Sequence, residues 1–159
     1  MTVDIYLQLP GIPGDSVDRD HRDWIPVTAV TWGVEQAASG GGGGGGRGGR
    51  ASQHPLVVSA PTSIASPLIF ETITKGTNLA TATLDVVRAG DRGGSTVIRW
   101  EFEDARLMRL GIAGGEAGFD DAFELVAKRA RLSVFPVDGR GAAGQPVSRG
   151  WDFATHRGW

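Results

Sequence analysis

Alternating apolar and polar residues dominate this chain and predict β-strands. The period of two recurs over residues 3–9, 24–36, 55–60, 80–88, 96–110, 122–137 and 147–155. Such alternation places apolar side chains on one face of a half-buried strand. Clusters of Gly, Pro, Asp and Ser separate several of these segments and indicate turns. We therefore expect a mainly β domain of about seven strands, a number typical of sandwiches and barrels.

One segment departs from this pattern and predicts a short helix at residues 67–75. Ser66 can cap the helix, Pro67 takes the favoured first helical position, and Gly76 follows the last turn. Three apolar side chains fall on one side of the segment: Ile69, Phe70 and Ile73. The helix can therefore dock on a sheet.

The alternation also predicts which side chains form the core. In the strand expected at 24–36, the even positions are bulky, whereas the odd positions are small and increasingly polar. The same reasoning applies to the aromatic residues of the later strands, which favour core packing over a ligand platform. The residues expected in the core are Val30, Trp32, Trp100, Phe102 and Trp151. The opposite face of the strand at 24–36 carries Ala29, Thr31 and Glu35.

Seven consecutive glycines at residues 40–46 interrupt the strands, followed by Arg47-Gly48-Gly49-Arg50. Glycine loses the most backbone entropy on ordering, so we expect a mobile Gly-rich loop at 38–53 within a single domain at 1–159. A phosphate-binding loop does not fit, because no Lys-Ser or Lys-Thr follows the glycines. The Arg-Gly-Gly-Arg segment resembles one unit of an RNA-binding repeat, but such units act in strongly basic arrays.

Composition narrows the function classes. The chain has 16 basic and 18 acidic residues and a formal net charge of −2, which gives no general attraction to nucleic acid or anionic membranes. It has no cysteine, so disulfides, thiol catalysis and thiolate zinc sites are excluded. The start of the chain lacks the pattern of a signal peptide, and no apolar run is long enough to span a bilayer. We expect a protein made in the cytoplasm without membrane insertion.

Side chains that could perform catalysis are scattered. His21, His54 and His156 do not have metal-ligand spacing and are expected to be surface or capping residues. Glu101 and Glu103 share one strand face, which favours a solvated surface or a subunit contact. The sequence therefore predicts no catalytic residue, metal or cofactor, and a protein that is not an enzyme.

Several segments, taken in order, form a recognisable set. The first strand at 3–9 (VDIYLQL) is followed by the short loop from Gly14 to His21 and by the segment 30–33 (VTWG) before a Gly-rich loop. The later segments are 66–68 (SPL), 82–90 (ATLDVVRAG) and 150–152 (GWD). Together they resemble the Hcp family, the tube proteins of bacterial type VI secretion systems. The pure glycine tract departs from the family pattern.

This resemblance implies a closed antiparallel β-barrel of two packed sheets with the helix on its side. It implies homohexameric rings that stack into a tube, with effector proteins in the lumen, a spike protein at the tip and a contractile sheath around the tube. Ala29, Thr31 and Glu35 would then face the lumen. The loop residues expected between rings or subunits are Gly40, Gly43, Gly46, Arg47 and Arg50. The machine would export the protein to the extracellular space or a target cell without a signal peptide.

Three other functions stay open at this point. One is a phage-type tail tube protein of another contractile injection machine. The second is a single-stranded nucleic-acid-binding module that uses the arm with Arg47 and Arg50. The third is a carbohydrate-active β-barrel enzyme that uses Glu101 or Asp104. Oligomeric state separates the tube proteins from the other two.

Overall fold

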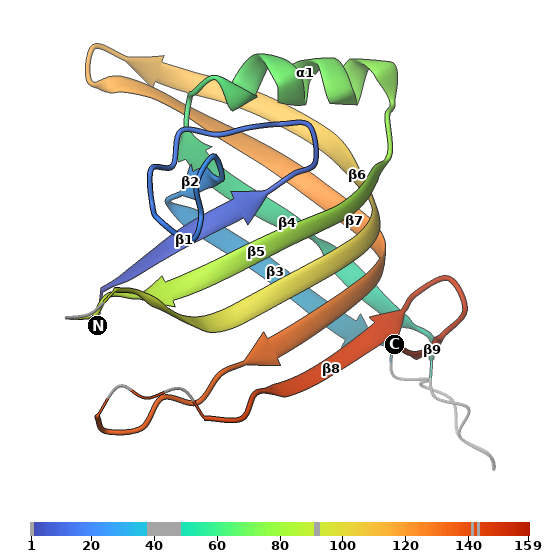
Figure 1. Ribbon diagram of the computed structural model, residues 1–159. Coiled ribbons are helices and arrows are strands. Elements are labelled where there is room, and N and C mark those ends of the chain that lie inside the picture. The colour runs from blue at the N-terminus through green and yellow to red at the C-terminus, as the bar shows by residue number, and fades with distance from the viewer. Residues whose placement is uncertain (1, 38–48, 91–92, 141, 143) are drawn as a thin grey trace.

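The computed structural model describes residues 2–37, 49–90, 93–140, 142 and 144–159 (Figure 1). Within these residues the chain forms one sheet and one helix. The elements in chain order are β1 (Val3–Gln8), β2 (Ile25–Val27), β3 (Ala29–Gln36), β4 (Ala51–Pro61), α1 (Ala65–Lys75), β5 (Leu79–Arg88), β6 (Ser95–Gly115), β7 (Gly118–Val134), β8 (Val147–Asp152) and β9 (Arg157–Gly158). The mainly β fold with one short helix therefore agrees with the pattern of the sequence.

The sheet is open, so the predicted closed barrel of two packed sheets is wrong. All strand pairs are antiparallel and belong to one sheet, in the order β2-β1-β5-β6-β7-β4-β3, with β8 on β7 and β9 on β8. Among the described residues, β2 and β3 form the two ends of this path and do not pair with each other. A barrel requires its first and last strands to be hydrogen-bonded.

The open edge arises because the strand expected at 24–36 is broken at Thr28. β2 pairs with β1, whereas β3 pairs with β4, so the chain passes from one edge of the sheet to the other within one residue. The backbone N–H and the hydroxyl of Thr28 both donate to the carbonyl oxygen of Ser59, at 2.8 and 3.0 Å. Ile25 and Val27 are buried before the break. The side chains that point inward therefore have odd residue numbers before Thr28, as in Ile25 and Val27, and even numbers after it, as in Val30 and Trp32.

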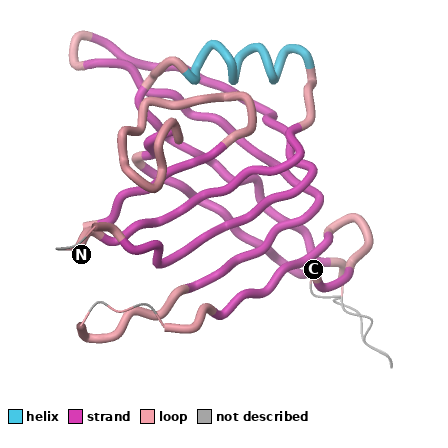
Figure 2. Tube along the Cα trace, viewed as in Figure 1, coloured by secondary structure: helices cyan, strands magenta, loops and turns pink. Residues whose placement is uncertain are grey.

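The sheet curls so that its two halves face each other across the core (Figures 1 and 2). Helix α1 lies over one end of the curled sheet and contacts β6. The first half of the path contributes Leu7, Ile25, Leu84 and Val86 to the core, and the second half contributes Leu56, Val58, Phe123 and Leu125. Burial of this apolar surface from both halves stabilises the curl.

Helix α1 begins two residues earlier than predicted. Ile64 is at the N-cap position without a side-chain capping hydrogen bond, and Ser66, the expected cap, lies buried in the first turn. The hydroxyl of Ser66 instead accepts the backbone N–H of Ser63 at 2.9 Å. The end of the helix is confirmed, because Gly76 adopts the left-handed conformation with φ of 64°.

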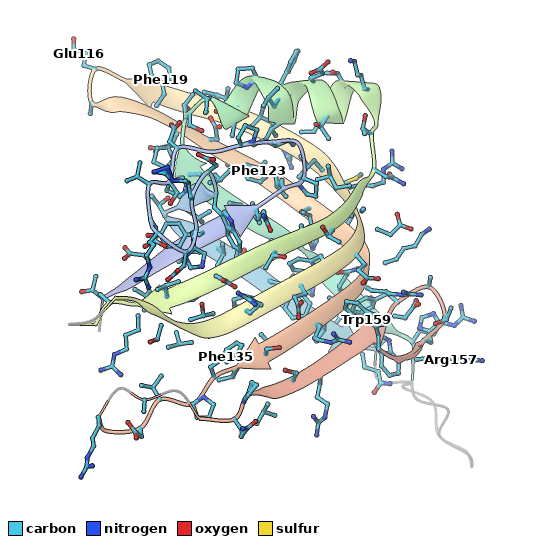
Figure 3. All side chains as sticks on the ribbon, in the orientation of Figure 1. Glu116, Phe119, Phe123, Phe135, Arg157 and Trp159 are labelled. Atoms are coloured by element: carbon cyan, nitrogen blue, oxygen red, sulfur yellow. The ribbon has the colours of Figure 1, made fainter. Side chains whose placement is uncertain are left out.

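Strands β6 and β7 form a hairpin that extends beyond the rest of the sheet. β6 pairs with β5 only as far as Ala105, and β7 pairs with β4 only from Asp120 onward. Residues 114–119 therefore project as a two-stranded tip beyond the last β4 pair. We call residues 111–120 the β6–β7 arm. Its tip carries Glu116 and lies at the upper left of the molecule in Figure 3.

Candidate functional site

The residues expected to face a lumen lie on the exposed side of β3. Ala29, Thr31 and Glu35 are all exposed, and the carboxylate of Glu35 is 3.4 Å from the imidazole of His54 on β4. Ala29 is opposite Ser59, a small polar neighbour on the same face. The outer face of β3 and β4 thus offers small and polar side chains to whatever lies against it.

The five residues expected in the core differ in burial. Phe102 is 1% exposed, and Trp32 packs against it edge to face with ring centroids 6.3 Å apart. Val30, Trp32 and Trp100 are half-buried and pack on the core. Trp151 is 37% exposed, so its assignment to the core is wrong. β8 lies at the margin of the sheet, beyond the part that the opposite half covers, and period two alone cannot detect this.

The described ends of the glycine tract lie side by side. The side-chain amide of Gln36 donates to the carbonyl oxygen of Gly49 at 2.7 Å, and Ala51 pairs with Gln36. Arg50 is exposed just before β4, and residues 51–53, expected within the loop, belong to that strand. Gly40, Gly43, Gly46 and Arg47 lie outside the described residues. The tract thus connects the paired ends of β3 and β4.

A buried charge cluster joins the loop at 10–24 to the sheet. Asp85 on β5 is fully buried, and Arg99 on β6 donates to both carboxylate oxygens at 2.6 and 2.7 Å. His21 Nε2 is 2.9 Å from the same carboxylate, and His21 Nδ1 is 2.8 Å from Asp18. Tyr6 stacks on the imidazole at 4.7 Å. His21 is 5% exposed, so its interpretation as a surface residue is wrong.

Every polar group of this cluster has a partner. Each ring nitrogen of His21 faces a carboxylate oxygen, and Arg99 pairs with the Asp85 carboxylate through two hydrogen bonds. The hydrogen bond from His21 is the largest cause that lowers the pKa of Asp18. The groups satisfy one another, so the cluster acts as an anchor for the loop.

The sequence held one signal for this cluster. Asp85 lies in an otherwise apolar run from Leu84 to Val87. A carboxylate in a strand buried on both faces requires a cation as partner. The sequence does not identify this partner, because His21 and Arg99 are distant from Asp85 in the chain.

A second buried carboxylate holds the start of helix α1. Asp121 on β7 is 3% exposed, and its carboxylate accepts the hydroxyl of Thr62 at 2.7 Å and the hydroxyl of Ser66. The carboxylate thus lies at the helix N-terminus, where unpaired backbone N–H groups favour negative charge. This contact explains how α1 can begin without a capping side chain at Ile64.

A third set of charges lines a surface pocket of about 660 Å³ between β5, β6 and the chain after β8. Arg129 pairs with Asp152 at 2.9 Å and with Glu103 at 3.1 Å, and Lys128 pairs with Asp104 at 2.6 Å. The backbone N–H of Thr155 and the Arg129 guanidinium lower the pKa of Asp152 to about 2. The carboxylates are paired with cations, which does not favour the acid and base roles of a glycosidase.

Two further observations concern other classes of protein. Among the described residues, no group of three His, Asp or Glu side chains could hold a metal ion. In the same part of the chain, no helix is long and apolar enough to cross a membrane.

Exposed apolar side chains occur at several places in the described part of the chain, and two of these places lie at opposite ends of β4. The first is the β6–β7 arm, where Ile112 is 52% exposed and Phe119 is 57% exposed. The second is a pocket of about 380 Å³ lined by Val34, Glu35, Gln36, Ala51, Trp151 and Phe153. Exposed apolar surface of this kind marks sites of contact with other molecules. The candidate functional surfaces are therefore the outer face of β3 and β4, the arm and this pocket.

Comparison with known families gives a match over most of the chain. A sequence model of the family described as "Type VI secretion system effector, Hcp" matches residues 6–129. A comparison with curated individual proteins finds no match.

Solved structures with the same fold include a type six secretion system protein that is 24% identical, with a TM-score of 0.90 over 99% of this chain and 100% of that chain. Hcp1 from Salmonella typhimurium is 23% identical, with a TM-score of 0.82 over 100% of both chains. Hcp2 from Salmonella typhimurium is 20% identical, with a TM-score of 0.72 over 97% of this chain and 98% of that chain. At these identities the likeness establishes the fold.

Proposed function

The chain belongs to the Hcp family of type VI secretion proteins, and from this membership we propose that six copies form a ring and that rings stack into the secretion tube. The observation that carries the proposal is the family match over residues 6–129. The fold supports it, because the same architecture recurs along the whole length of other type VI secretion proteins.

The outer face of β3 and β4 forms the wall of the lumen in this proposal. Ala29 and Thr31 are small and exposed, and Glu35 is charged. Small and polar side chains keep a channel wet and leave room for a folded cargo. Effector proteins travel against this face.

The glycine tract provides contacts between neighbouring subunits or rings. Its described ends, Gln36 and Gly49, are hydrogen-bonded to each other at the end of the β3–β4 hairpin. The connection can therefore be shortened without separating these two strands. We expect its shortening to impair ring stacking more than hexamer formation, as measured by electron microscopy of purified particles.

The remaining partners follow from the place of a tube in the machine. A spike protein closes the tip, and a contractile sheath surrounds the tube. The protein is made in the cytoplasm, and contraction of the sheath exports it.

Sizing of the purified protein tests the proposal. Light scattering after gel filtration should give a particle of six copies of the 16.7 kDa chain, and electron micrographs should show rings with an open centre. A monomer at micromolar concentration would contradict the proposal. Salt-dependent retention on single-stranded RNA would instead support the nucleic-acid function.

A ring alone does not separate a secretion tube from a phage-type tail tube. The second measurement is therefore made in the producing bacterium. The protein should appear in the culture medium only when the type VI sheath is intact. Release that continues without the sheath would overturn the assignment to secretion.

A further inference from the structure

The β6–β7 arm presents an exposed aromatic ring that is already held in place. Phe119 is opposite Gly114, and a Cβ built on Gly114 would lie 2.6 Å from Cγ of Phe119. The side chain of Phe119 therefore packs directly on the backbone of the facing strand. The ring is 57% exposed, and Ile112 beside it is 52% exposed on the same face of the ribbon.

A side chain held this way loses little conformational freedom when a partner covers it. Rigid aromatic residues in the centre of an interface supply much of its binding energy. The tip of the arm at residues 114–119 also has no third strand beside it, and a two-stranded ribbon is only marginally stable in water, so contact with a partner would stabilise the tip. Both properties indicate that Phe119 is an anchor for another molecule.

The apolar pocket is a suitable receptor for such an anchor. Val34, Trp151 and Phe153 all line it; Val34 is 54% exposed, Trp151 is 37% exposed and Phe153 is half-buried. Its volume of about 380 Å³ lies near the lower end of the range for ligand pockets and accommodates one aromatic side chain.

The arm cannot reach the pocket of its own chain. Strand β4 connects the two places, because Pro61 pairs with Asp120 of the arm and Ala51 lines the pocket. The 11 residues of β4 span roughly 35 Å. Figure 3 shows Glu116 and Phe119 at one end of the molecule and Arg157 and Trp159 at the other. A contact between arm and pocket is therefore made between two copies.

The charges around the two surfaces are complementary. Residues 111–120 contain the acidic side chains of Glu116 and Asp120 and no basic residue. Three exposed arginines neighbour residues that line the pocket in the chain or across the strands. Arg50 precedes Ala51, Arg149 is two residues before Trp151 on the same face of β8, and Arg157 on β9 pairs with Asp152. The one acidic residue that lines the pocket, Glu35, is paired with His54 at 3.4 Å. Opposite charge steers the arm to the pocket and sets the orientation of the contact.

We propose that Phe119 of one copy inserts into the pocket formed by Val34, Trp151 and Phe153 of the next copy. The contact joins two different surfaces of the same chain, so it is head-to-tail and repeats from copy to copy. This inference rests on the proposed assembly into rings and specifies which surfaces meet in it.

Cysteine cross-linking tests the contact directly, because the chain has no cysteine of its own. Ala117→Cys, which keeps Phe119 and lies two residues from it on the arm, and Val34→Cys are made as separate variants, mixed, disassembled in mild denaturant, and reassembled. A short bismaleimide should then give covalent dimers in the mixture. A mixture of Phe70→Cys and Val34→Cys is the matched control, because Phe70 is 62% exposed on α1 and is not part of the arm. It should give none.

The outcomes distinguish this contact from the assembly itself. Rings of normal size without the arm-to-pocket cross-link would contradict the proposed contact but would still agree with the proposed function. A wild-type protein that stays monomeric would overturn both.

A substitution series gives an independent measure. Phe119→Ala and Trp151→Ala should each raise the concentration of half-assembly by about tenfold or more, because each removes one side of the same contact. Phe70→Ala should change it less than about twofold. The variant with both Phe119→Ala and Trp151→Ala should have a concentration of half-assembly close to that of either single variant. Additive effects, or an equal effect of Phe70→Ala, would contradict the proposed contact.

Discussion

At the scale of single residues, Asp85 shows how a buried charge organises a loop. Its carboxylate is fully buried and is paired with Arg99 and His21 from two other parts of the chain. A buried charge that keeps its partners is tolerated, whereas one that loses a partner is strongly unfavourable. The loop at 10–24 is therefore held by charge as well as by packing.

Replacement of Arg99 should show this dependence. Arg99→Ala leaves Asp85 without its bidentate cation, and we expect the free energy of unfolding to fall by about 3 kcal/mol. Urea denaturation at fixed protein concentration measures the change. Arg19→Ala is the control, because its ion pair with Asp20 is exposed and contributes less than about 1 kcal/mol. Equal effects of the two substitutions would contradict the role of Asp85.

Asp152 predicts a dependence of stability on pH. Its pKa is lowered from 3.8 to about 2 in the folded chain, chiefly by the backbone N–H of Thr155 and by Arg129. The ionised carboxylate therefore favours folding. Its contribution is fully present above about pH 4 and is lost as the pH falls toward about 2.

The substitution Asp152→Asn removes this titration. We expect the urea midpoint of the variant to change less than that of the wild type between about pH 5 and about pH 2. Identical curves for the two proteins would show that Asp152 has no part in acid unfolding.

At the scale of elements, local pattern predicted the existence of most strands and of the helix, but tertiary contacts set their ends. Helix α1 begins at Ala65 because the carboxylate of Asp121 on β7 accepts hydrogen bonds from the hydroxyls of Ser66 and Thr62 at the N-terminus of the helix. The break at Thr28 depends on the carbonyl of Ser59. Neither partner is visible from the sequence around the element concerned.

Removal of Asp121 should loosen the start of α1. Asp121→Ala leaves two hydroxyls without their acceptor, and we expect a loss of about 2 kcal/mol. Hydrogen exchange of the α1 amides should quicken more than that of β5. The matched control is Asp120→Ala, because Asp120 is the exposed neighbour on the same strand. Unchanged exchange in α1 would contradict the anchoring role of Asp121.

At the scale of the whole molecule, the curled open sheet separates an apolar interior from a small, polar outer face on β3 and β4. In the proposed ring this outer face meets the cargo. The fold thus gives one chain a core and, in the proposed ring, a channel wall and two different contact surfaces.

A substitution on the outer face should separate cargo binding from assembly. Thr31→Gln adds bulk to an exposed position, so rings should remain intact while co-purification of effector proteins falls. Electron micrographs and effector recovery from the same preparation measure both properties. Loss of the ring in this variant would place Thr31 in a subunit contact instead of the lumen.

The sequence by itself determined the strand-rich composition of the fold, the helix ending at Gly76 and the buried position of Phe102. These follow from near-neighbour physics: the period of the apolar side chains and the conformational freedom of glycine. The ordered set of segments also indicated the family.

Only the tertiary structure decided the open sheet, the exposure of Trp151 and the pairing of Asp85 with Arg99 and His21. Each depends on which distant strand or loop lies against a residue. A strand has the same period of two at an edge, in a barrel or beyond the core, so periodicity cannot distinguish these places.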